Sequence, residues 1–364
     1  MAQLDRQAVD AALAAYVEPH LECDLVSAGC IESVEIDGGR VALKVCLGFP
    51  ARRLAARLRE ALAGTLAQLP GVTAVDVVVT SRIEPRAPDP ADPVALPGVR
   101  NVLAVSSGKG GVGKSTTAVN LALALADEGA RVGMLDADLY GPSLPRMLGI
   151  AGRPRSVDGK RFQPLMNYGL QAMSAGFLVD EEEPMIWRGS MVTQALEQLL
   201  RETEWKDLDY LVIDMPPGTG DVQLTLAQRV KLAGAVVVTT PQDIALLDAT
   251  RGLKMFDKVG VPVLGVIENM GLHVCSHCGH AEHVFGDGGG LRMADRHTVD
   301  FLGSLPLDIR IREQADNGMP TVAADPDGAL ADAYREIARK MVARLSRRQA
   351  AARSAMPTIT ISDS

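Results

Sequence analysis

The sequence predicts an α/β fold with a doubly wound, mostly parallel sheet, preceded by a small α+β domain. Two observations carry this prediction. From residue 99 onward, strand-like and helix-like segments alternate, and most strand-like segments are near-continuous aliphatic runs, as in parallel strands buried on both faces. Before that point, residues 85–97 hold five prolines in thirteen positions, which can extend neither a helix nor a central strand.

These observations divide the chain into four parts. Its 364 residues predict about two domains, at roughly 100–200 residues per domain. We expect a small N-terminal α+β domain over residues 1–84 and a proline-rich linker over 85–98. The α/β domain follows over residues 99–348, and residues 349–364 are predicted to form a flexible tail.

The small domain is predicted to contain two helices and three strands. A helix over residues 4–16 is followed by strands over 29–36 and 40–48, which the turn Asp37-Gly38-Gly39 joins as a hairpin. An amphipathic helix over 51–68 and an alternating strand over 72–80 complete the unit. This order predicts one sheet with helices covering one face.

The large domain is predicted to alternate strands and helices to its end. The strands are expected over residues 101–107, 131–138, 210–215, 234–240, 261–268 and 301–304. The helices are expected over residues 115–128, 190–202, 222–230, 244–259 and 328–348. Such alternation is typical of βαβ units and a parallel sheet.

Composition and charge exclude several function classes. The 37 basic and 45 acidic residues give a net charge of −8, which is not typical of a general nucleic-acid binder. No uninterrupted apolar run is long enough to span a membrane, and Asp5 and Asp10 stand where a secretory signal needs an apolar core. Five cysteines are too few for a disulfide framework. We therefore expect a cytoplasmic protein without a nucleic-acid or membrane partner.

A phosphate-binding loop follows the first strand of the large domain. Residues 108–115 read GKGGVGKS, which matches G-x-x-x-x-G-K-[ST] between a strand and a helix. Glycines let successive N–H groups point at phosphates, Lys114 is expected to reach the β- and γ-phosphates, and the Ser115 hydroxyl to ligate Mg²⁺. The sequence thus predicts an ATP site in a P-loop NTPase domain. Its residues are Gly108, Lys109, Gly110, Gly111, Val112, Gly113, Lys114, Ser115 and Thr116.

Three acidic residues stand at predicted strand ends. Asp214 closes an apolar strand in the manner of a Walker B site and could hold Mg²⁺ through water. Asp136 and Asp138 end the second strand, and either could position the attacking water; the alternative is that these acids only cap loops. Their expected place at the carboxyl edge of one parallel sheet favours a catalytic role.

A second lysine, Lys109, lies inside the loop. The segment GKGGVGKST resembles the deviant Walker A motif of the MinD, ParA and nitrogenase iron-protein class of ATPases. The resemblance implies that Lys109 crosses a dimer interface and acts as a charge clamp on the partner's nucleotide phosphates. The chain would then be a nucleotide-sandwich homodimer.

A Cys-x-x-Cys pair, Cys275 and Cys278, follows a later strand. It could form a zinc site with His280 and His283, act as a redox dithiol, or meet a second pair in a two-fold dimer around one [4Fe–4S] cluster. From the residues alone, zinc ranks first, because four possible ligands lie close together. The dimer argument from Lys109 raises the bridging cluster, and the dithiol is weakest.

Further motifs complete a recognisable set. The motifs are GKGGVGKST, DADLYGPS over 136–143, DMPPGTGD over 214–221, TTPQDIALLDA over 239–249 and NMGLHVCSHCGH over 269–280. Together with the small N-terminal domain, these motifs resemble the Mrp/ApbC family of iron–sulfur cluster carrier ATPases over nearly the whole length of the chain.

The resemblance implies a function and a set of site residues. An ATP-binding homodimer would hold a labile [4Fe–4S] cluster between subunits and transfer it to apoproteins. Cys275 and Cys278 would ligate the cluster, and Asn269 would contact adenine. Hydrolysis is expected to be slow, because Lys109 is the only candidate for an arginine-finger role.

One departure and two alternatives remain. Many related small domains have a cysteine–proline pair, whereas here Cys46 lies four residues before Pro50, so Cys23, Cys30 and Cys46 are interpreted as packing residues or incidental thiols. One alternative function is a MinD/ParA-type positioning ATPase, although the alanine-rich C-terminal end would bind lipid poorly. The other is a switch ATPase with a structural zinc.

Overall fold

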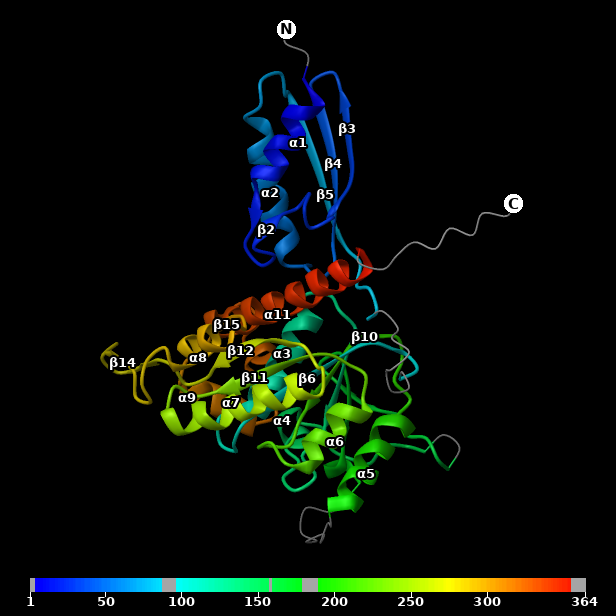
Figure 1. Ribbon diagram of the computed structural model, residues 1–364, viewed down its shortest axis with the longest axis vertical. Coiled ribbons are helices and arrows are strands. Elements are labelled where there is room, and N and C mark those ends of the chain that lie inside the picture. Colours follow the sequence, from blue (N-terminus) through cyan, green and yellow to red (C-terminus); the bar gives the residue numbers. More distant parts are fainter. Residues whose placement is uncertain (1–3, 87–95, 157–158, 179–188, 355–364) are drawn as a thin grey trace. The chain divides into compact units, whose positions relative to one another are not determined.

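The computed structural model describes residues 4–86, 96–156, 159–178 and 189–354 of the chain. It divides into two compact units, a small one made of Met1–Pro88 with Val342–Ser364 and a large one made of Asp89–Met341 (Figure 1). Most of the predicted linker and residues 355–364 of the predicted tail lie outside the described residues. The domain boundaries given above stay a prediction.

The small unit has the α+β composition expected from the sequence. Its sheet has the order β3-β4-β5, with β3 (Ile31–Asp37) antiparallel to β4 (Arg40–Leu47) and β4 parallel to β5 (Ala74–Ser81). Helices α1 (Arg6–Ala15) and α2 (Leu54–Ala67) pack together, and α2 also contacts β5 (Figure 1). Two short paired strands, β1 (Val17–Glu18) and β2 (Cys23–Asp24), were not predicted.

Burial explains why these segments fold as they do. Every fourth residue of α2, from Leu54 to Leu66, is buried, as expected of an amphipathic helix. Alternate residues of β4 are buried from Val41 to Leu47, as expected of a strand with one covered face.

The last helix, α11 (Ala329–Ser354), contributes to both units. Sequence analysis ended it at residue 348 and predicted a flexible tail from 349; that prediction was wrong for residues 349–354, which are helical. Alanine has the highest helix propensity, so the alanine-rich segment after Arg348 continues the helix. Within the small unit, Arg347 Nη1 donates to the Leu21 carbonyl at 2.7 Å and Arg344 forms an ion pair with Glu22.

The large unit is built on an eight-stranded sheet of order β15-β12-β11-β6-β10-β7-β9-β8. All of its strand pairs are parallel except β8 with β9. This confirms the predicted doubly wound, mostly parallel fold. The strands are β6 (Val99–Ser107), β7 (Val132–Asp136), β8 (Leu165–Asn167), β9 (Leu170–Ser174), β10 (Leu208–Asp214), β11 (Leu232–Thr239), β12 (Val263–Glu268) and β15 (Phe301–Ser304).

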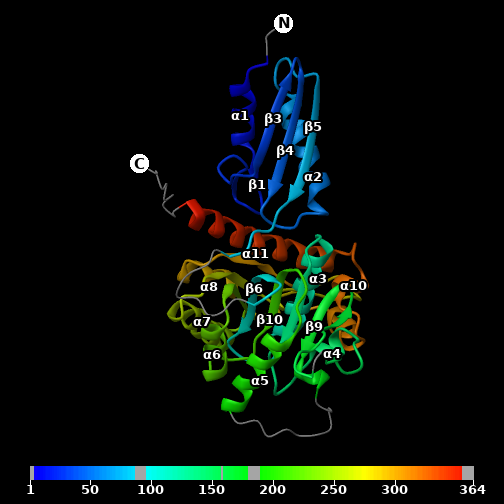
Figure 2. The ribbon, with the colours of Figure 1, turned by 90° about the vertical axis from the view of Figure 1, so that its right-hand side faces the viewer.

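Helices cover both faces of this sheet. Helix α3 (Lys114–Asp127) lies against one face, while α5 (Gly189–Glu202), α6 (Asp221–Arg229) and α7 (Asp243–Lys258) gather on the other (Figures 1 and 2). Sequence analysis missed β8, β9 and several short helices. These helices are α4 (Leu144–Met147), the 3₁₀ helix η1 (Ala175–Phe177), α8 (Gly289–His297), α9 (Ile309–Asp316) and α10 (Thr321–Ala324).

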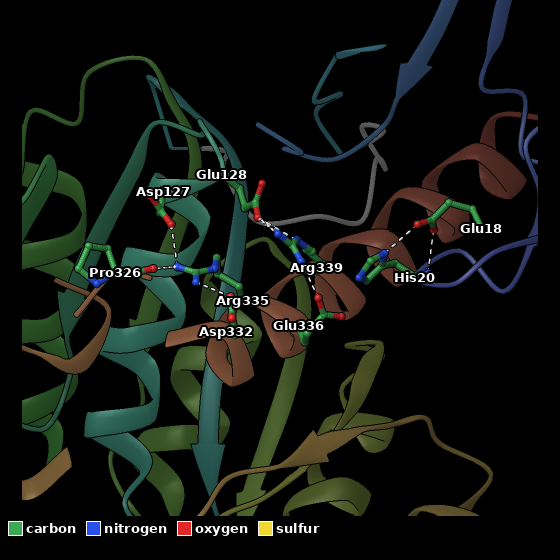
Figure 3. Close-up of polar contacts among 9 residues, drawn as sticks. All are labelled: Glu18, His20, Asp127, Glu128, Pro326, Asp332, Arg335, Glu336 and Arg339. Atoms are coloured by element: carbon green, nitrogen blue, oxygen red, sulfur yellow. Dashed lines mark hydrogen bonds and ion pairs between the residues drawn. The ribbon is translucent and has the colours of Figure 1, made fainter. Parts of the chain in front are cut away.

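Two buried arginines attach the first part of α11 to the end of α3. Arg335 Nη1 lies 3.0 Å from Asp127 Oδ2, and Arg339 Nε donates to Glu128 Oε1 at 2.8 Å (Figure 3). Arg335 is 2% exposed and Arg339 is 9% exposed, so these charges depend on their partners for solvation. They fix the far end of the helix that begins at the P-loop.

No helix in the described part of the chain has the length and apolar character needed to cross a membrane.

Candidate nucleotide and cluster-binding site

The P-loop runs from the end of β6 at Ser107 to the start of α3 at Lys114. Gly111 and Gly113 have φ angles of 82° and 80°, in the left-handed region that favours glycine. At Gly113 space is limiting as well, since a Cβ would lie 2.1 Å from Asn269 Nδ2. The glycine at 113 is therefore required by both the backbone conformation and the neighbouring side chain.

A pocket of about 660 Å³ opens beside this loop. It lies at the carboxyl edge of the parallel sheet, where ligands bind in doubly wound folds. Most of the predicted site residues line it: Lys109, Gly110, Gly111, Gly113, Lys114, Ser115, Thr116, Asp138 and Asn269.

The far wall of the pocket was not predicted from the sequence. That wall comes from α4, α9 and the loop after β15, whose short elements lack a helical or strand repeat long enough to recognise. Its residues include Arg146, Met147, Pro306, Leu307, Ile311 and Arg312.

Lys114, which lines the pocket, forms a buried ion pair with Asp214. Their side chains are 6% and 1% exposed, and Lys114 Nζ also lies 3.2 Å from Ser115 Oγ. A charged lysine held by a carboxylate at this depth can exchange that partner for a phosphate oxygen. Three residues that the sequence assigned to nucleotide and magnesium binding, Lys114, Ser115 and Asp214, therefore lie together.

Asp136 and Asp138 lie in different surroundings. Asp136 Oδ2 accepts hydrogen bonds from the backbone N–H groups of Ser143, at 2.9 Å, and Leu144, at 3.1 Å. Burial, reinforced by the charge of Asp214, raises the pKa of Asp136 to about 7. Asp136 is thus held by the start of α4 and does not line the pocket, whereas Asp138 does.

Asp138 is half-buried, and its backbone N–H donates to Asp136 Oδ1 at 3.1 Å. Burial raises the pKa of the Asp138 carboxyl as well. A carboxylate that lines the pocket and is destabilised by burial is a better proton acceptor than a solvated one. Of the two acids, Asp138 alone is placed to meet a molecule in the pocket.

Asn269 connects the end of β12 to the P-loop. Its Nδ2 donates to the Val112 carbonyl at 2.9 Å, and its side chain is buried. Asn269 also lines the pocket, so the side chain that holds the P-loop is in reach of a molecule bound there.

Cys275 and Cys278 lie in the turn between β13 (His273–Val274) and β14 (Ala281–Glu282), and we call residues 273–282 the cysteine hairpin. Gly279, with φ 71°, donates its N–H to the Cys275 carbonyl at 2.9 Å and closes the turn. N–H groups of Cys278 and His277 donate to Cys275 Sγ and lower its pKa. Cys278 is exposed, so the pair is accessible from solvent.

The cysteine hairpin is attached to the segment that follows β15. His273 Nδ1 and the Leu307 carbonyl lie 2.9 Å apart, and Leu307 N donates to the Leu272 carbonyl at 2.8 Å. Pro306, Leu307 and Met270 also line the nucleotide pocket. The pocket and the cysteine hairpin therefore share two adjacent backbone segments, residues 269–273 and 305–308.

The Cys275–Cys278 pair is not part of a larger ligand cluster in the described part of the chain. Among residues that the structure describes, no three His, Cys, Asp or Glu side chains are arranged to hold a metal ion. His283, one of the expected zinc ligands, has its Nδ1 2.6 Å from the Gly271 carbonyl. The two thiols of the cysteine hairpin stand without a third protein ligand in this part of the chain.

Comparison with known proteins identifies both parts of the sequence. A family model described as NUBPL iron-transfer P-loop NTPase matches residues 98–342, and a model for iron–sulfur cluster assembly proteins matches residues 6–77. The chain is 58% identical to an iron–sulfur cluster carrier protein of Pseudomonas fragi over 275 residues, which cover 75% of this chain and 96% of the relative.

Two further relatives have carrier or transfer names. The iron–sulfur cluster carrier protein of Escherichia coli K12 is 48% identical over 341 residues, covering 93% of this chain and 92% of the relative. The mouse iron–sulfur cluster transfer protein NUBPL is 53% identical over 252 residues, covering 69% of this chain and 79% of the relative.

Solved structures agree with the fold. A nucleotide-binding protein of Archaeoglobus fulgidus, solved in complex with ADP, is 35% identical with a TM-score of 0.54, covering 61% of this chain and 87% of that one. The cell division ATPase MinD of Pyrococcus furiosus is 22% identical with a TM-score of 0.50, covering 66% and 98%, and shows the fold alone. The resemblance to iron–sulfur carrier ATPases that the motifs predicted is confirmed, and the chain belongs to the family of NUBPL iron-transfer P-loop NTPases.

Proposed function

We propose that this protein is an iron–sulfur cluster carrier that binds a [4Fe–4S] cluster at a homodimer interface and delivers it to apoproteins. In this proposal ATP binding and slow hydrolysis control the delivery. Membership of a P-loop NTPase family supports ATP binding and hydrolysis. The carrier and transfer names of the relatives support an iron–sulfur cluster as the cargo. We expect it to act in the reducing cytoplasm, where thiols stay free.

One observation carries the proposal. A single chain joins a P-loop pocket to an accessible cysteine hairpin through two shared backbone segments. The hairpin supplies two thiolates, whereas a [4Fe–4S] cluster takes about four cysteine ligands. Two copies related by a two-fold axis would supply them, because a symmetric interface brings the same residues of both chains together.

The nucleotide site would be completed by Mg²⁺. The donor set fits this ion, since the Ser115 hydroxyl and the Asp214 carboxylate are hard oxygen ligands near the phosphate loop. When bound, Mg²⁺ supplies positive charge that neutralises the phosphates. Lys114 would then leave Asp214 for the phosphates, while P-loop N–H groups hold the remaining phosphate oxygens.

Asp138 is our candidate for orienting the attacking water, with Asp136 as a positioning residue. This division follows from the geometry, in which Asp138 lines the pocket and Asp136 is bonded to the backbone of α4. Lys109 also lines the pocket, on the P-loop. In the sandwich dimer it would act on the partner's nucleotide, and a lysine in place of an arginine finger is consistent with slow turnover.

The shared segments explain how nucleotide state could control the cluster. A ligand that packs against Met270, Pro306 and Leu307 changes the position of residues hydrogen-bonded to the base of the cysteine hairpin. Because the cluster needs both hairpins of the dimer, a small shift of each changes the spacing between the two cysteine pairs. ATP would thus select between cluster-holding and cluster-releasing arrangements.

Anaerobic reconstitution with iron and sulfide tests the proposal. We would measure iron, sulfide and zinc per dimer and the visible absorption, beside a Cys275→Ala/Cys278→Ala variant. The proposal expects about four irons and four sulfides per dimer, lost in the variant. One tightly bound zinc per monomer without sulfide would overturn it and leave a switch ATPase with a structural metal.

The positioning-ATPase alternative is tested separately. Pelleting with anionic liposomes or with DNA, with and without ATP, should leave this protein in the supernatant. ATP-dependent pelleting together with failure to bind a cluster would favour the MinD/ParA-type function instead.

A further inference from the structure

The fold brings together three cysteines of the small unit that are separated in sequence. Cys23 lies in β2, Cys30 directly precedes β3, and Cys46 lies in β4. Cys46 N donates to the Cys30 carbonyl at 2.8 Å, and the next residues along the two strands, Ile31 and Val45, are paired. Cys30 and Cys46 are therefore direct cross-strand neighbours.

Their side chains share one face of the sheet. Cys46 alternates with the buried Val45 and Leu47, which places Cys46 and Gly48 on the opposite face from those two residues. Directly opposed residues of an antiparallel pair project to the same face of the sheet, so the side chain of Cys30 lies on the face of Cys46. Directly opposed residues of an antiparallel pair have Cα atoms about 4.5–5.5 Å apart, within the disulfide range of about 4.4–6.8 Å.

The two thiols differ in accessibility. Cys30 is 5% exposed, whereas Cys46 and Cys23 are half-buried and can be reached from solvent. Burial, followed by the charges of the nearby Cys23 and Cys46, raises the pKa of Cys30 to about 11. Of the opposed pair, Cys46 therefore meets an external reagent first, and the buried Cys30 reacts second.

We propose that Cys30 and Cys46 form a thiol–disulfide exchange site that low-molecular-weight disulfides oxidise. The Cys46 thiolate attacks one sulfur of the small disulfide and forms a mixed disulfide, releasing one small thiol. Cys30 then gives up its proton and attacks Cys46 Sγ, releasing the second small thiol. The thiols of Cys30 and Cys46 become one disulfide, which joins the residue before β3 to β4, and the small disulfide becomes two small thiols.

The test uses the full-length protein carrying Cys275→Ala and Cys278→Ala, so that Cys23, Cys30 and Cys46 are the only thiols left. It is incubated, folded, with oxidised glutathione and then analysed by intact mass and by peptide mapping without reduction. The proposal expects a loss of two hydrogen atoms in mass and one crosslinked peptide pair containing Cys30 and Cys46.

Single variants in this background assign the chemistry. Cys23→Ser should form the same disulfide, whereas Cys46→Ser should not lose two hydrogen atoms. Cys46→Ala serves as a second version, and circular dichroism with thermal unfolding checks that each variant is folded. An unchanged parent mass, a disulfide that contains Cys23, or a disulfide that forms only in denaturant would overturn the proposal.

Discussion

At the scale of single residues, the site depends on buried charges that pair with each other. Lys114, which lines the pocket, and the buried Asp214 neutralise each other. Removing one partner of such a pair leaves a buried, unpaired charge, which typically costs about 3–5 kcal/mol. Nucleotide binding replaces one partner of Lys114 by another, so the same lysine serves both the stability of the free protein and its affinity for phosphates.

Lys114→Ala should therefore weaken both properties while leaving the cysteine hairpin intact. We expect nucleotide affinity to fall roughly tenfold to a hundredfold, the effect of losing a charge-assisted hydrogen bond. Isothermal titration with ATP measures this loss. The reconstituted cluster content should stay near that of the parent, with cluster delivery in the cell impaired; loss of the cluster from the folded variant would contradict this division of roles.

A double variant separates the two effects. Lys114→Met/Asp214→Asn removes both charges, so it should recover much of the unfolding free energy that Lys114→Ala loses but none of the nucleotide affinity. Denaturant unfolding without ligand, measured beside the titrations, makes the comparison. Equal stability of the single and double variants would show that the ion pair contributes little.

Asp136 should make the stability of the ligand-free protein depend on pH. Its pKa is about 7 in the folded chain and about 4 in an unfolded one, so between these values the folded state binds more protons. The free energy of unfolding therefore falls as pH rises from about 4 to about 7, and the penalty is complete above that window. Asp136→Asn removes this contribution and should flatten the dependence.

Urea unfolding across the same pH range measures the slope. Asp243→Asn, at an exposed position in the first turn of α7, is the control and should follow the parent. An Asp136→Asn slope equal to that of the parent would mean that Asp136 does not retain its proton in the folded state.

At the scale of elements, the P-loop places different demands on its glycines. Gly113 has a positive φ and its Cβ position is occupied by Asn269, whereas a Cβ on Gly110 would meet nothing within 4 Å. Motif matching treats both as loop glycines. Of these two glycines, only Gly113 is fixed by a tertiary contact, which the segment after β12 makes.

Gly113→Ala should thus lower ATP affinity at least tenfold, because the strained loop and the displaced Asn269 both alter the pocket, at a cost of about 1–3 kcal/mol. Gly110→Ala is the matched control and should stay within about 0.5 kcal/mol of the parent in stability. Titration with ATP and thermal unfolding of both variants provide the measurement. Similar losses in the two variants would refute the distinction.

The elements that could be read from the sequence are the long ones. The aliphatic strands β6, β10 and β11 and the helices α3 and α7 were predicted because their burial repeats along enough residues to be recognised. The short α4 and α9 were missed, although they form the far wall of the pocket. Their positions follow from packing against the sheet, which leaves no repeat in so few residues.

At the scale of the whole molecule, α11 gives the small unit a part that is distant in sequence. Residues from Val342 onward belong with the N-terminal residues, and Arg347 donates to the Leu21 carbonyl. A boundary drawn from composition alone assigns this helix to the large domain. The stability of the small unit should therefore depend on the C-terminal helix.

Arg347→Ala should destabilise the small unit by about 0.5–1.5 kcal/mol, the usual net contribution of a hydrogen bond, because the Arg347 side chain is itself exposed. Arg348→Ala changes the neighbouring exposed arginine and should have little effect. Hydrogen exchange of amides in β3, β4 and β5 in the full-length variants would report the difference. Equal exchange in the two variants would show that the Arg347 contact is not stabilising.

The sequence by itself determined the fold class, the phosphate-binding loop, the acids at the strand ends and the cysteine pair. These are local signals, because residue type and spacing along one segment are enough to specify them. Only the tertiary structure decided that Asp138 and not Asp136 lines the pocket, that Asn269 limits Gly113, and that Cys30 opposes Cys46. Each of these depends on segments distant in sequence that meet only when the sheet forms and its helices bury their apolar faces.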